Sequence, residues 1–311
     1  MSPSRRFALP HASPYLLLTL TAFFWSFNWV VGRAMVGYVS PIALTFLRWC
    51  VAVAVMMPFA WPLIRAHRAQ LAQNWKLIVR LGFWGTGLHN VFAYVGLQFT
   101  TATNGVMLNS AIPIWIIVLG WLVYRDTITR LQALGVAVSI TGVFAILTAG
   151  DPAVLMNLTL NKGDVIVMLG MIFWAAYTIY LREKPAELPG LAVLACCACV
   201  GVVLLLPLCL VEMALFEGTI RLTPATIGAL LYVGIFPSFV GYVFWNRAVA
   251  EVGPNVAGNF LYLMPAFGSL LAWLFLGESL RLYHIAGIGL ILAGIALAAR
   301  GRRVVPAPGP E

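Results

Sequence analysis

The sequence predicts an all-α polytopic membrane protein with ten transmembrane helices, arranged as two inverted five-helix repeats. Three observations lead to this prediction: the composition, ten long apolar stretches, and a pattern of residues that recurs in the second half of the chain. Of the 311 residues, 62% are hydrophobic and only 9% are charged. Since soluble domains carry about 25% charged residues, a soluble fold could not bury this much apolar surface.

The apolar stretches have the length that a membrane crossing requires, about 20 residues. They predict spans at 14–36, 41–63, 76–98, 103–124, 131–149, 164–182, 189–211, 225–247, 255–277 and 282–300. A cytoplasmic segment is expected over 1–13 and a disordered cytoplasmic tail over 301–311. The first stretch is too long for the apolar core of a signal peptide, so we expect it to be a true span.

The positions of Lys and Arg orient these spans. With the N-terminus in the cytoplasm, fourteen of the nineteen basic residues fall inside, and four fall outside: Arg33, Lys162, Arg221 and Arg281. This positive-inside bias predicts a multi-pass protein of the cell (inner or plasma) membrane with both termini cytoplasmic, which requires an even number of spans. The bias also accounts for the net charge of +9, so we expect no nucleic-acid partner.

The two halves of the chain, 14–150 and 151–300, resemble each other. Trp25 and Trp174 lie in similar aromatic runs 149 residues apart. The later pairs share an offset of 152 residues: Pro113 and Pro265, Asp126 and Glu278, Gly135 and Gly287, Gly142 and Gly294, and Gly82 and Gly234. Because each half has five spans, the second half must cross the membrane in the opposite sense. Inverted repeats place a binding site near the midplane and give it two alternative closures, which predicts a transporter.

Several of these motifs together carry a family resemblance. The run Phe-Trp-Ser-Phe-Asn at 24–28 lies in the first span, and Pro41 and Arg48 lie in the second. With the paired prolines and acids above, the chain resembles the two EamA-type repeats of the drug/metabolite transporter superfamily over roughly residues 14–300. The resemblance implies export of amino acids or other small metabolites, and it implies a recurrent structural role for Arg48. The two repeats differ at one motif: the first has Arg125-Asp126 at the positions where the second has Gly277-Glu278.

Midplane aromatic and polar residues are the first candidates for a solute cavity. Trp25 and Trp174 lie near the centres of their spans, away from the interfaces where tryptophan gathers. Asn28 and Tyr177 each lie three residues further on, on the same helical face. The alternative to a cavity wall is helix packing with interhelical hydrogen bonds.

His89 and Arg48 are ionisable groups within predicted spans. An intramembrane histidine is a functional candidate that could bind solute or relay a proton, or be neutral and satisfied by a neighbour. Arg48 must pair or face water.

Prolines near the middle of three spans, at Pro113, Pro237 and Pro265, predict kinks that could serve as gating points. The polar residues that flank them are further solute-contact candidates: Asn109, Ser238, Tyr242, Asn259 and Tyr262.

Small-residue patterns recur in the last span of each half. Ala137-x-x-x-Thr141 and Gly289-x-x-x-Ala293 predict close helix packing, either between the halves or in a dimer. We therefore expect a monomer or a weak homodimer.

All ten acidic residues lie in loops or near span ends. The cavity should therefore suit zwitterions, neutral solutes or anions better than cations. The leading hypothesis is a facilitated exporter of amino acids or related metabolites, driven by the gradient of the solute itself. A proton-coupled multidrug or metabolite antiporter is the alternative. An intramembrane enzyme or a channel fits less well, because we find no metal-ligand spacing, nucleophile–base pair or ring of like residues. We expect no cofactor, metal or catalytic residue, and the partners are a small solute and the lipid bilayer.

Overall fold

The computed structural model describes residues 12–100, 105, 108–148, 150–151, 153, 161–216, 218–276 and 282–301. These residues form helices, turns and extended connections, with one isolated bridge between Val39 and Ile220, which confirms the all-α prediction. The elements are α1 (Pro14–Ala34), α2 (Pro41–Ala66), α3 (Arg68–Gln73), α4 (Trp75–Leu81), π-helical η2 (Gly82–Leu88), α5 (His89–Gly96), α7 (Ile112–Tyr124), α8 (Arg130–Leu147), α10 (Lys162–Tyr180), η3 (Leu181–Glu183), α11 (Gly190–Leu215), α12 (Pro224–Val233), π-helical η4 (Gly234–Val240), α13 (Gly241–Val252), α14 (Pro254–Asn259), 3-10 η5 (Phe260–Tyr262), α15 (Leu263–Leu276) and α16 (Leu282–Arg300).

Six helices of the described chain are long and apolar enough to cross a membrane: Pro14–Ala34, Pro41–Ala66, Lys162–Glu183, Gly190–Leu215, Pro224–Val252 and Leu282–Arg300. The other predicted spans are shorter or interrupted. The π-helical η2 interrupts the helical path over 75–96, and the 3-10 turn η5 interrupts the path over 254–276. The predicted span 103–124 lies partly outside the described residues. Helix α3 forms where the sequence analysis placed a connection.

Local sequence sets where several helices begin. Proline occupies the first turn of α1, α2, α12 and α14, where its missing N–H costs nothing and its fixed φ suits a helix. Thr129 begins α8 with a capping box, because its hydroxyl accepts from the Gln132 N–H and the Gln132 side chain accepts from the Thr129 N–H. Asn161 and Asp164 form the same arrangement at the start of α10.

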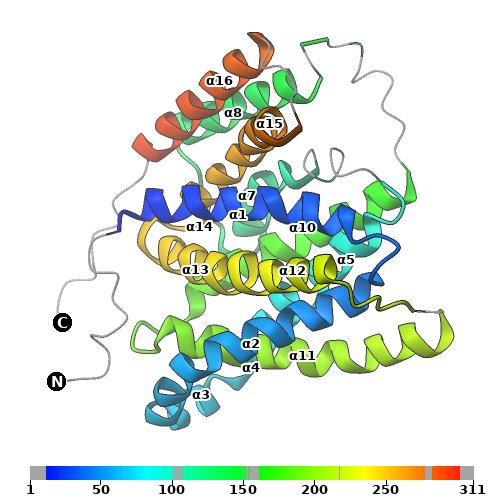
Figure 1. Ribbon diagram of the computed structural model, residues 1–311. Coiled ribbons are helices and arrows are strands. Elements are labelled where there is room, and N and C mark those ends of the chain that lie inside the picture. The colour runs from blue at the N-terminus through cyan, green and yellow to red at the C-terminus, as the bar shows by residue number, and fades with distance from the viewer. Residues whose placement is uncertain are drawn as a thin grey trace, which may run out of the picture.

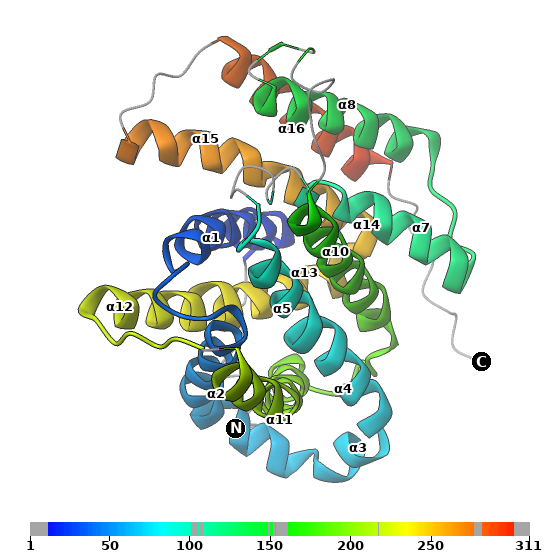
Figure 2. The ribbon, with the colours of Figure 1, turned by 90° about the vertical axis from the view of Figure 1, so that its right-hand side faces the viewer.

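The helices lie in three groups (Figures 1 and 2). Helices α8, α15 and α16 lie on one side, and α2, α4 and α11 lie on the other. Between them run α1, α5, α7, α10 and α13. The extensive pairings are α8 with α16, α2 with α11, α5 with α10, and α1 with α13. The middle group therefore joins helices from both halves of the chain.

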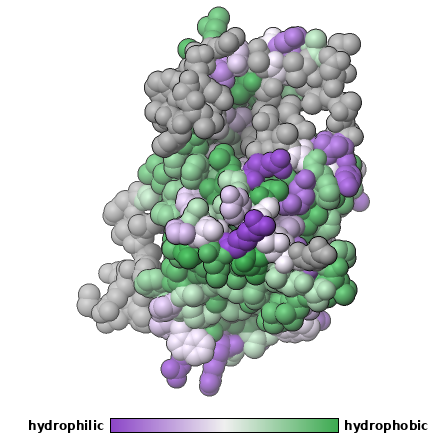
Figure 3. All heavy atoms as spheres, turned by 45° about the vertical axis from the view of Figure 1, so that its right-hand side comes forward, coloured by the Kyte–Doolittle hydropathy of each residue, from purple (hydrophilic) through white to green (hydrophobic). Residues whose placement is uncertain are grey.

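Hydrophobic side chains cover much of the coloured part of the face drawn in Figure 3, with hydrophilic residues in patches among them. Several large aliphatic side chains are highly exposed: the exposed fraction is 69% for Val203, 73% for Leu215 and 81% for Leu282. A soluble protein rarely leaves so many such residues in water. This surface and the six long helices make the chain a multi-pass membrane protein.

Helices α8 and α16 pack with their backbones almost touching. A Cβ added at Gly135 would lie 2.6 Å from the Gly294 carbonyl oxygen, and one at Gly142 would lie 2.6 Å from that of Gly287. The predicted motif residues do not make this contact, since Ala137, Thr141, Gly289 and Ala293 are exposed. The prediction that these two helices pack closely is thus confirmed, and a dimer contact through the exposed motif residues stays a prediction. A seven-residue spacing of glycines forms the seam.

Candidate functional site

A cavity lies between the middle helices and α2. Its walls come from α1, α2, α5, α7, α10, α13 and α15, and are formed by Trp25, Asn28, Trp29, Arg48, His89, Asn90, Ala93, Tyr94, Asn109, Ile112, Trp174, Tyr242 and Met264. The space between these walls is about 490 Å³, but only about 30 Å³ of it can hold the centre of a water molecule. The cavity is therefore narrow in this conformation, and its walls must move to admit an organic solute.

The two repeat-related tryptophans meet in the wall of this cavity. The rings of Trp25 and Trp174 lie edge to face, with centroids 4.8 Å apart. Tyr242 and Trp245 extend the cluster, with ring centroids 5.1 and 5.6 Å from that of Trp174. The Trp25 Nε1–H donates to the Pro237 carbonyl oxygen at 2.9 Å. The aromatic wall thus joins α1 and α10 to α13.

Arg48 is buried, with 2% exposure, and lines the cavity. Its Nε donates to Ser238 Oγ at 2.8 Å, and its Nη1 donates to Asn90 Oδ1 at 2.9 Å and to Tyr94 Oη at 2.7 Å. Ion pairs between described residues do not include Arg48. The guanidinium is therefore a buried positive charge held by neutral groups.

His89 borders the same cavity, with its ring centroid 4.9 Å from that of Trp174. Its Nδ1 lies 2.8 Å from the Gly170 carbonyl oxygen. Because a carbonyl oxygen only accepts, Nδ1 must carry a proton. With Nδ1 protonated, Nε2 presents a lone pair when the ring is neutral and a second N–H when it is charged.

Six of the ten solute-contact candidates line the cavity: Trp25, Asn28, His89, Asn109, Trp174 and Tyr242. Asn28 Oδ1 accepts from the Tyr94 hydroxyl at 2.9 Å, and Asn109 Nδ2 lies 3.0 Å from the Met264 sulfur. These contacts leave the Nδ2 group of Asn28 as a donor at the cavity.

The other four candidates lie behind the wall. Tyr177 stacks at 5.1 Å against Trp174 and donates its hydroxyl to Asn246 Oδ1. Ser238 supports Arg48. Asn259 donates to the Asn255 carbonyl oxygen, and Tyr262 is fully buried with no hydrogen-bond partner for its hydroxyl in the described part of the chain. The structure does not bring these residues into contact with the cavity.

The three prolines behave differently from one another. Pro237 lies inside the π-helical η4, and the Ser238 hydroxyl donates at 2.6 Å to the Val233 carbonyl oxygen. This bond replaces the one that a proline cannot donate to the residue four positions earlier. Pro265 lies in the first turn of α15, which begins at Leu263 directly after the 3-10 turn η5. Pro113 lies in the first turn of α7, where proline is tolerated, and a turn at Ser110–Ala111 separates α7 from the helical residues Leu108–Asn109.

Asn90 and Tyr94 are the cavity residues that sequence reasoning missed. Asn90 accepts from Arg48 and donates at 3.2 Å to the Gly85 carbonyl oxygen, and Tyr94 links Arg48 to Asn28. A signal existed: the two are polar groups at helical spacing within the apolar stretch that contains His89. The sequence did single out Arg48, but the family resemblance implied a structural role for it.

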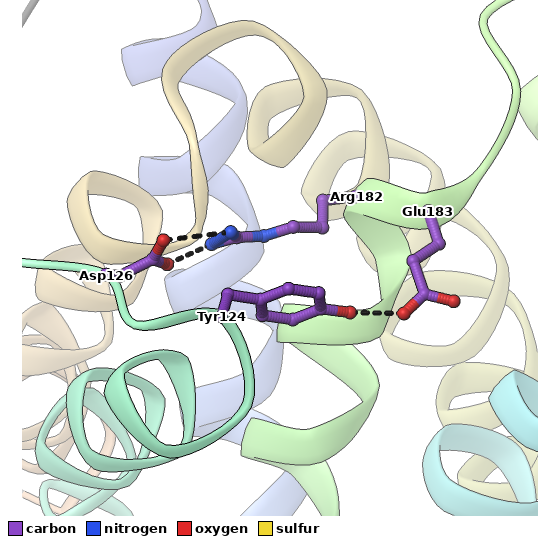
Figure 4. A network of polar contacts seen from close by, with 4 residues as sticks. All are labelled: Tyr124, Asp126, Arg182 and Glu183. Carbon is purple, nitrogen blue, oxygen red and sulfur yellow. Dashed lines mark hydrogen bonds and ion pairs between the residues drawn. The ribbon is translucent and has the colours of Figure 1, made fainter.

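A polar network joins helix ends beyond the cavity (Figure 4). Arg182 pairs with Asp126, with Nη1 donating to Oδ1 at 3.1 Å, and its guanidinium lies 4.2 Å from the Tyr124 ring centroid. Glu183 accepts from the Tyr124 hydroxyl and pairs with Arg80. The network thus ties the ends of α4, α7 and α10. Since Arg182 follows Trp174 by eight residues, along α10 and the 3-10 turn η3, the network lies about 12 Å beyond the cavity.

Comparisons with known proteins agree with this arrangement. The sequence profile of the EamA-like transporter family matches residues 12–148 and again residues 161–300. The chain is 25% identical to "Uncharacterized transporter YyaM" of Bacillus subtilis over 93% of this chain and 94% of that protein. It is 26% identical to a Streptantibioticus cattleyicolor protein named "Probable terminal-alkyne amino-acid exporter", over 92% and 94%. A solved structure with 19% identity has a TM-score of 0.72 over 94% of this chain and 99% of that chain, so the two share a fold.

Proposed function

Because the chain belongs to the EamA-like transporter family, matched once in each half, we propose that it exports small organic solutes by alternating access around the Trp25–Trp174 cavity. The family and the named relatives are transporters and not enzymes, as the sequence predicted. The observation that carries the mechanism is the meeting of the two repeat-related tryptophans in one cavity wall. A site shared by both repeats is what two alternative closures require.

The proposal keeps ten membrane helices in two inverted repeats, with both termini cytoplasmic. It is supported by the two family matches and by helical paths over 75–96, 224–252 and 254–276, each of which takes the place of one predicted span. Membrane helices tolerate such π and 3-10 interruptions where neighbouring helices satisfy the freed backbone groups. In this topology the network of Figure 4 lies at the cytoplasmic end of the cavity.

We propose amino acids or related zwitterionic and neutral metabolites as the solutes. The described cavity wall contains no carboxylate that would attract a cation. The two buried carboxylates elsewhere are engaged at helix starts: Glu212 accepts from the backbone N–H groups of Ile42 and Ala43, and Asp164 accepts from Asn161 and Thr100. The name of one relative, an amino-acid exporter, also supports this class.

Counterflow in proteoliposomes tests the proposal. Vesicles loaded with one unlabelled amino acid should transiently accumulate the labelled form, since a carrier exchanges solute across the membrane, whereas an enzyme or a channel does not. We expect at least one member of a panel of amino acids and neutral metabolites to show this exchange. Exchange confined to lipophilic cations would contradict the proposed solute class, and no exchange with any solute would contradict carriage.

An imposed pH gradient in the same vesicles tests the coupling. We propose downhill movement with no obligatory proton, because the described cavity wall contains no carboxylate and an apolar surrounding favours the neutral form of His89. The gradient should change the final solute level by less than about twofold. Accumulation that needs the gradient and disappears in His89→Ala would instead establish the proton-coupled antiporter.

The network of Figure 4 should hold the cytoplasmic end closed. Asp126→Asn removes the carboxylate that pairs with Arg182. The pair is about one-third exposed, so the expected effect is below about 1 kcal/mol, or up to about fivefold in the closed-to-open ratio. A cysteine placed at Ala93 in the cavity wall should then react faster with a membrane-impermeant thiol reagent added from the cytoplasmic side.

The matched control is Arg247→Gln. Arg247 pairs with Glu251 one turn further along α13, at 2.8 Å, and does not bridge two helices through that pair. Its loss should leave the labelling rate unchanged. Equal labelling of the Asp126→Asn variant and the parent would show that the network does not restrain opening.

A further inference from the structure

We propose that Arg48 binds a carboxylate of the solute, so that the cavity selects acids and zwitterions over amides and cations. The inference rests on the proposed transport function for its biological meaning, but it concerns binding and can be tested without transport. In this proposal Arg48 binds solute in addition to making its hydrogen bonds within the fold.

The first argument is charge balance. A buried arginine in a membrane needs a negative partner or water, because an isolated charge in an apolar medium is costly. Arg48 is 2% exposed, and no carboxylate among the described residues pairs with it. The ion pairs of the described chain lie at helix ends instead. The cavity therefore carries an excess positive charge that an anionic group of a solute would neutralise.

The second argument is geometry. Guanidinium has five N–H groups. Nε–H is taken by Ser238, and the two N–H groups of Nη1 are taken by Asn90 and Tyr94. In the described part of the chain the two N–H groups of Nη2 have no hydrogen-bond partner, and Arg48 lines the cavity. Neutral side chains thus hold Nε and Nη1 and leave the two N–H groups of Nη2 as donors for a solute.

The third argument is the neighbourhood of those donors. Tyr94 receives a hydrogen bond from Arg48 and donates to Asn28 Oδ1, which leaves the Asn28 amide Nδ2 as a second neutral donor at the cavity. A charged donor and a neutral donor on the same cavity wall favour a carboxylate over an amide, because charge-assisted hydrogen bonds are about twice as strong as neutral ones.

The alternative is that Arg48 is purely structural and only ties α2 to α5 and η4. This alternative predicts a different result. Its loss would weaken every ligand equally, through the shape of the cavity. A carboxylate-binding Arg48 selects between ligands that differ in a single group.

The test is binding to the purified full-length protein in detergent, followed by tryptophan fluorescence. Alanine, leucine and phenylalanine are each compared with their amides and their N-acetyl derivatives. The amide removes the carboxylate, and acetylation removes only the ammonium. We expect at least one acid to bind about tenfold or more tighter than its amide, and the acetylated acid to keep that advantage over the acetylated amide.

Variants locate the selectivity. In Arg48→Gln the acid-to-amide affinity ratio should fall to about one, and in Arg48→Lys it should be intermediate, since the charge remains but the planar donor array is lost. Arg33→Gln is the matched control, because Arg33 is an exposed arginine bonded to the Leu97 carbonyl oxygen, away from the cavity. Its ratio should equal that of the wild type.

Three outcomes overturn the proposal: amides that bind as tightly as acids in the wild type, no binding by any of the acids, or an unchanged ratio in Arg48→Gln. If the glutamine variant does not fold, the wild-type ratio and Arg48→Lys still decide. Failure of the transport proposal can be distinguished from failure of this one. Vesicles without counterflow would refute carriage, while the acid-to-amide affinity ratio could still be measured.

Discussion

Replacing Trp25 with alanine should abolish most transport while the protein still folds and inserts. Trp25 is half-buried, lines the cavity and contacts Trp174 at 4.8 Å. A tryptophan at the centre of a binding surface is worth about 2 kcal/mol or more, so the transport rate at low solute concentration should fall about thirtyfold. Trp25→Phe keeps an aromatic wall but loses the bond to the Pro237 carbonyl, and it should retain more activity than the alanine variant.

Trp121→Ala is the matched control, because Trp121 is 51% exposed on the outer surface and does not line the cavity. Initial rates of solute exchange, normalised to the amount of folded protein in the vesicles, compare the variants. Equal rates for Trp25→Ala and the wild type would show that the ring only packs helices.

Replacing Gly294 with leucine should prevent correct folding. A Cβ there would lie 2.2 Å from Ser139 Oγ and 2.5 Å from the Gly135 carbonyl oxygen, and the second atom is backbone that cannot rotate away. Overpacking of well-packed sites costs about 1–3 kcal/mol, and a clash with the backbone of a neighbouring helix should exceed that range. We expect α8 and α16 to separate, with a large loss of monodisperse protein after detergent extraction.

Gly289→Leu provides the comparison on the same helix. Nothing lies within 4 Å of a Cβ at Gly289, so this variant should extract and melt like the wild type. If Gly294→Leu melted at the same temperature as Gly289→Leu, the close seam between the two helices would not contribute to the fold.

The features that depend on residue identity alone could be predicted from the sequence. The repeat offset singled out Trp25 and Trp174, and the structure shows that the two rings touch. The family profile matches the two halves separately, and each match contains one of the two tryptophans.

Features that depend on the direction in which a side chain points around its helix could not be predicted from the sequence. A π-helical segment adds a residue to a turn and shifts every later side chain around the axis. Such segments precede α5 and α13, so the positions of Asn90 and Tyr94 relative to Arg48 could not be read from a regular spacing. The glycines of the seam between α8 and α16 could not be singled out for a similar reason: composition marks a helix as rich in small residues, but only the neighbouring helix decides which face is buried.

Alternating access of the cavity is the central claim, and two-sided labelling of a cysteine at Ala93 tests it most directly. Ala93 is 7% exposed and lines the cavity, and the background replaces Cys50, Cys196, Cys197, Cys199 and Cys209. A membrane-impermeant thiol reagent is added to either side of oriented vesicles. The account predicts reaction from both sides, with a transported solute changing the two rates in opposite directions. Reaction from one side only, or a solute that slows both rates equally, would contradict it.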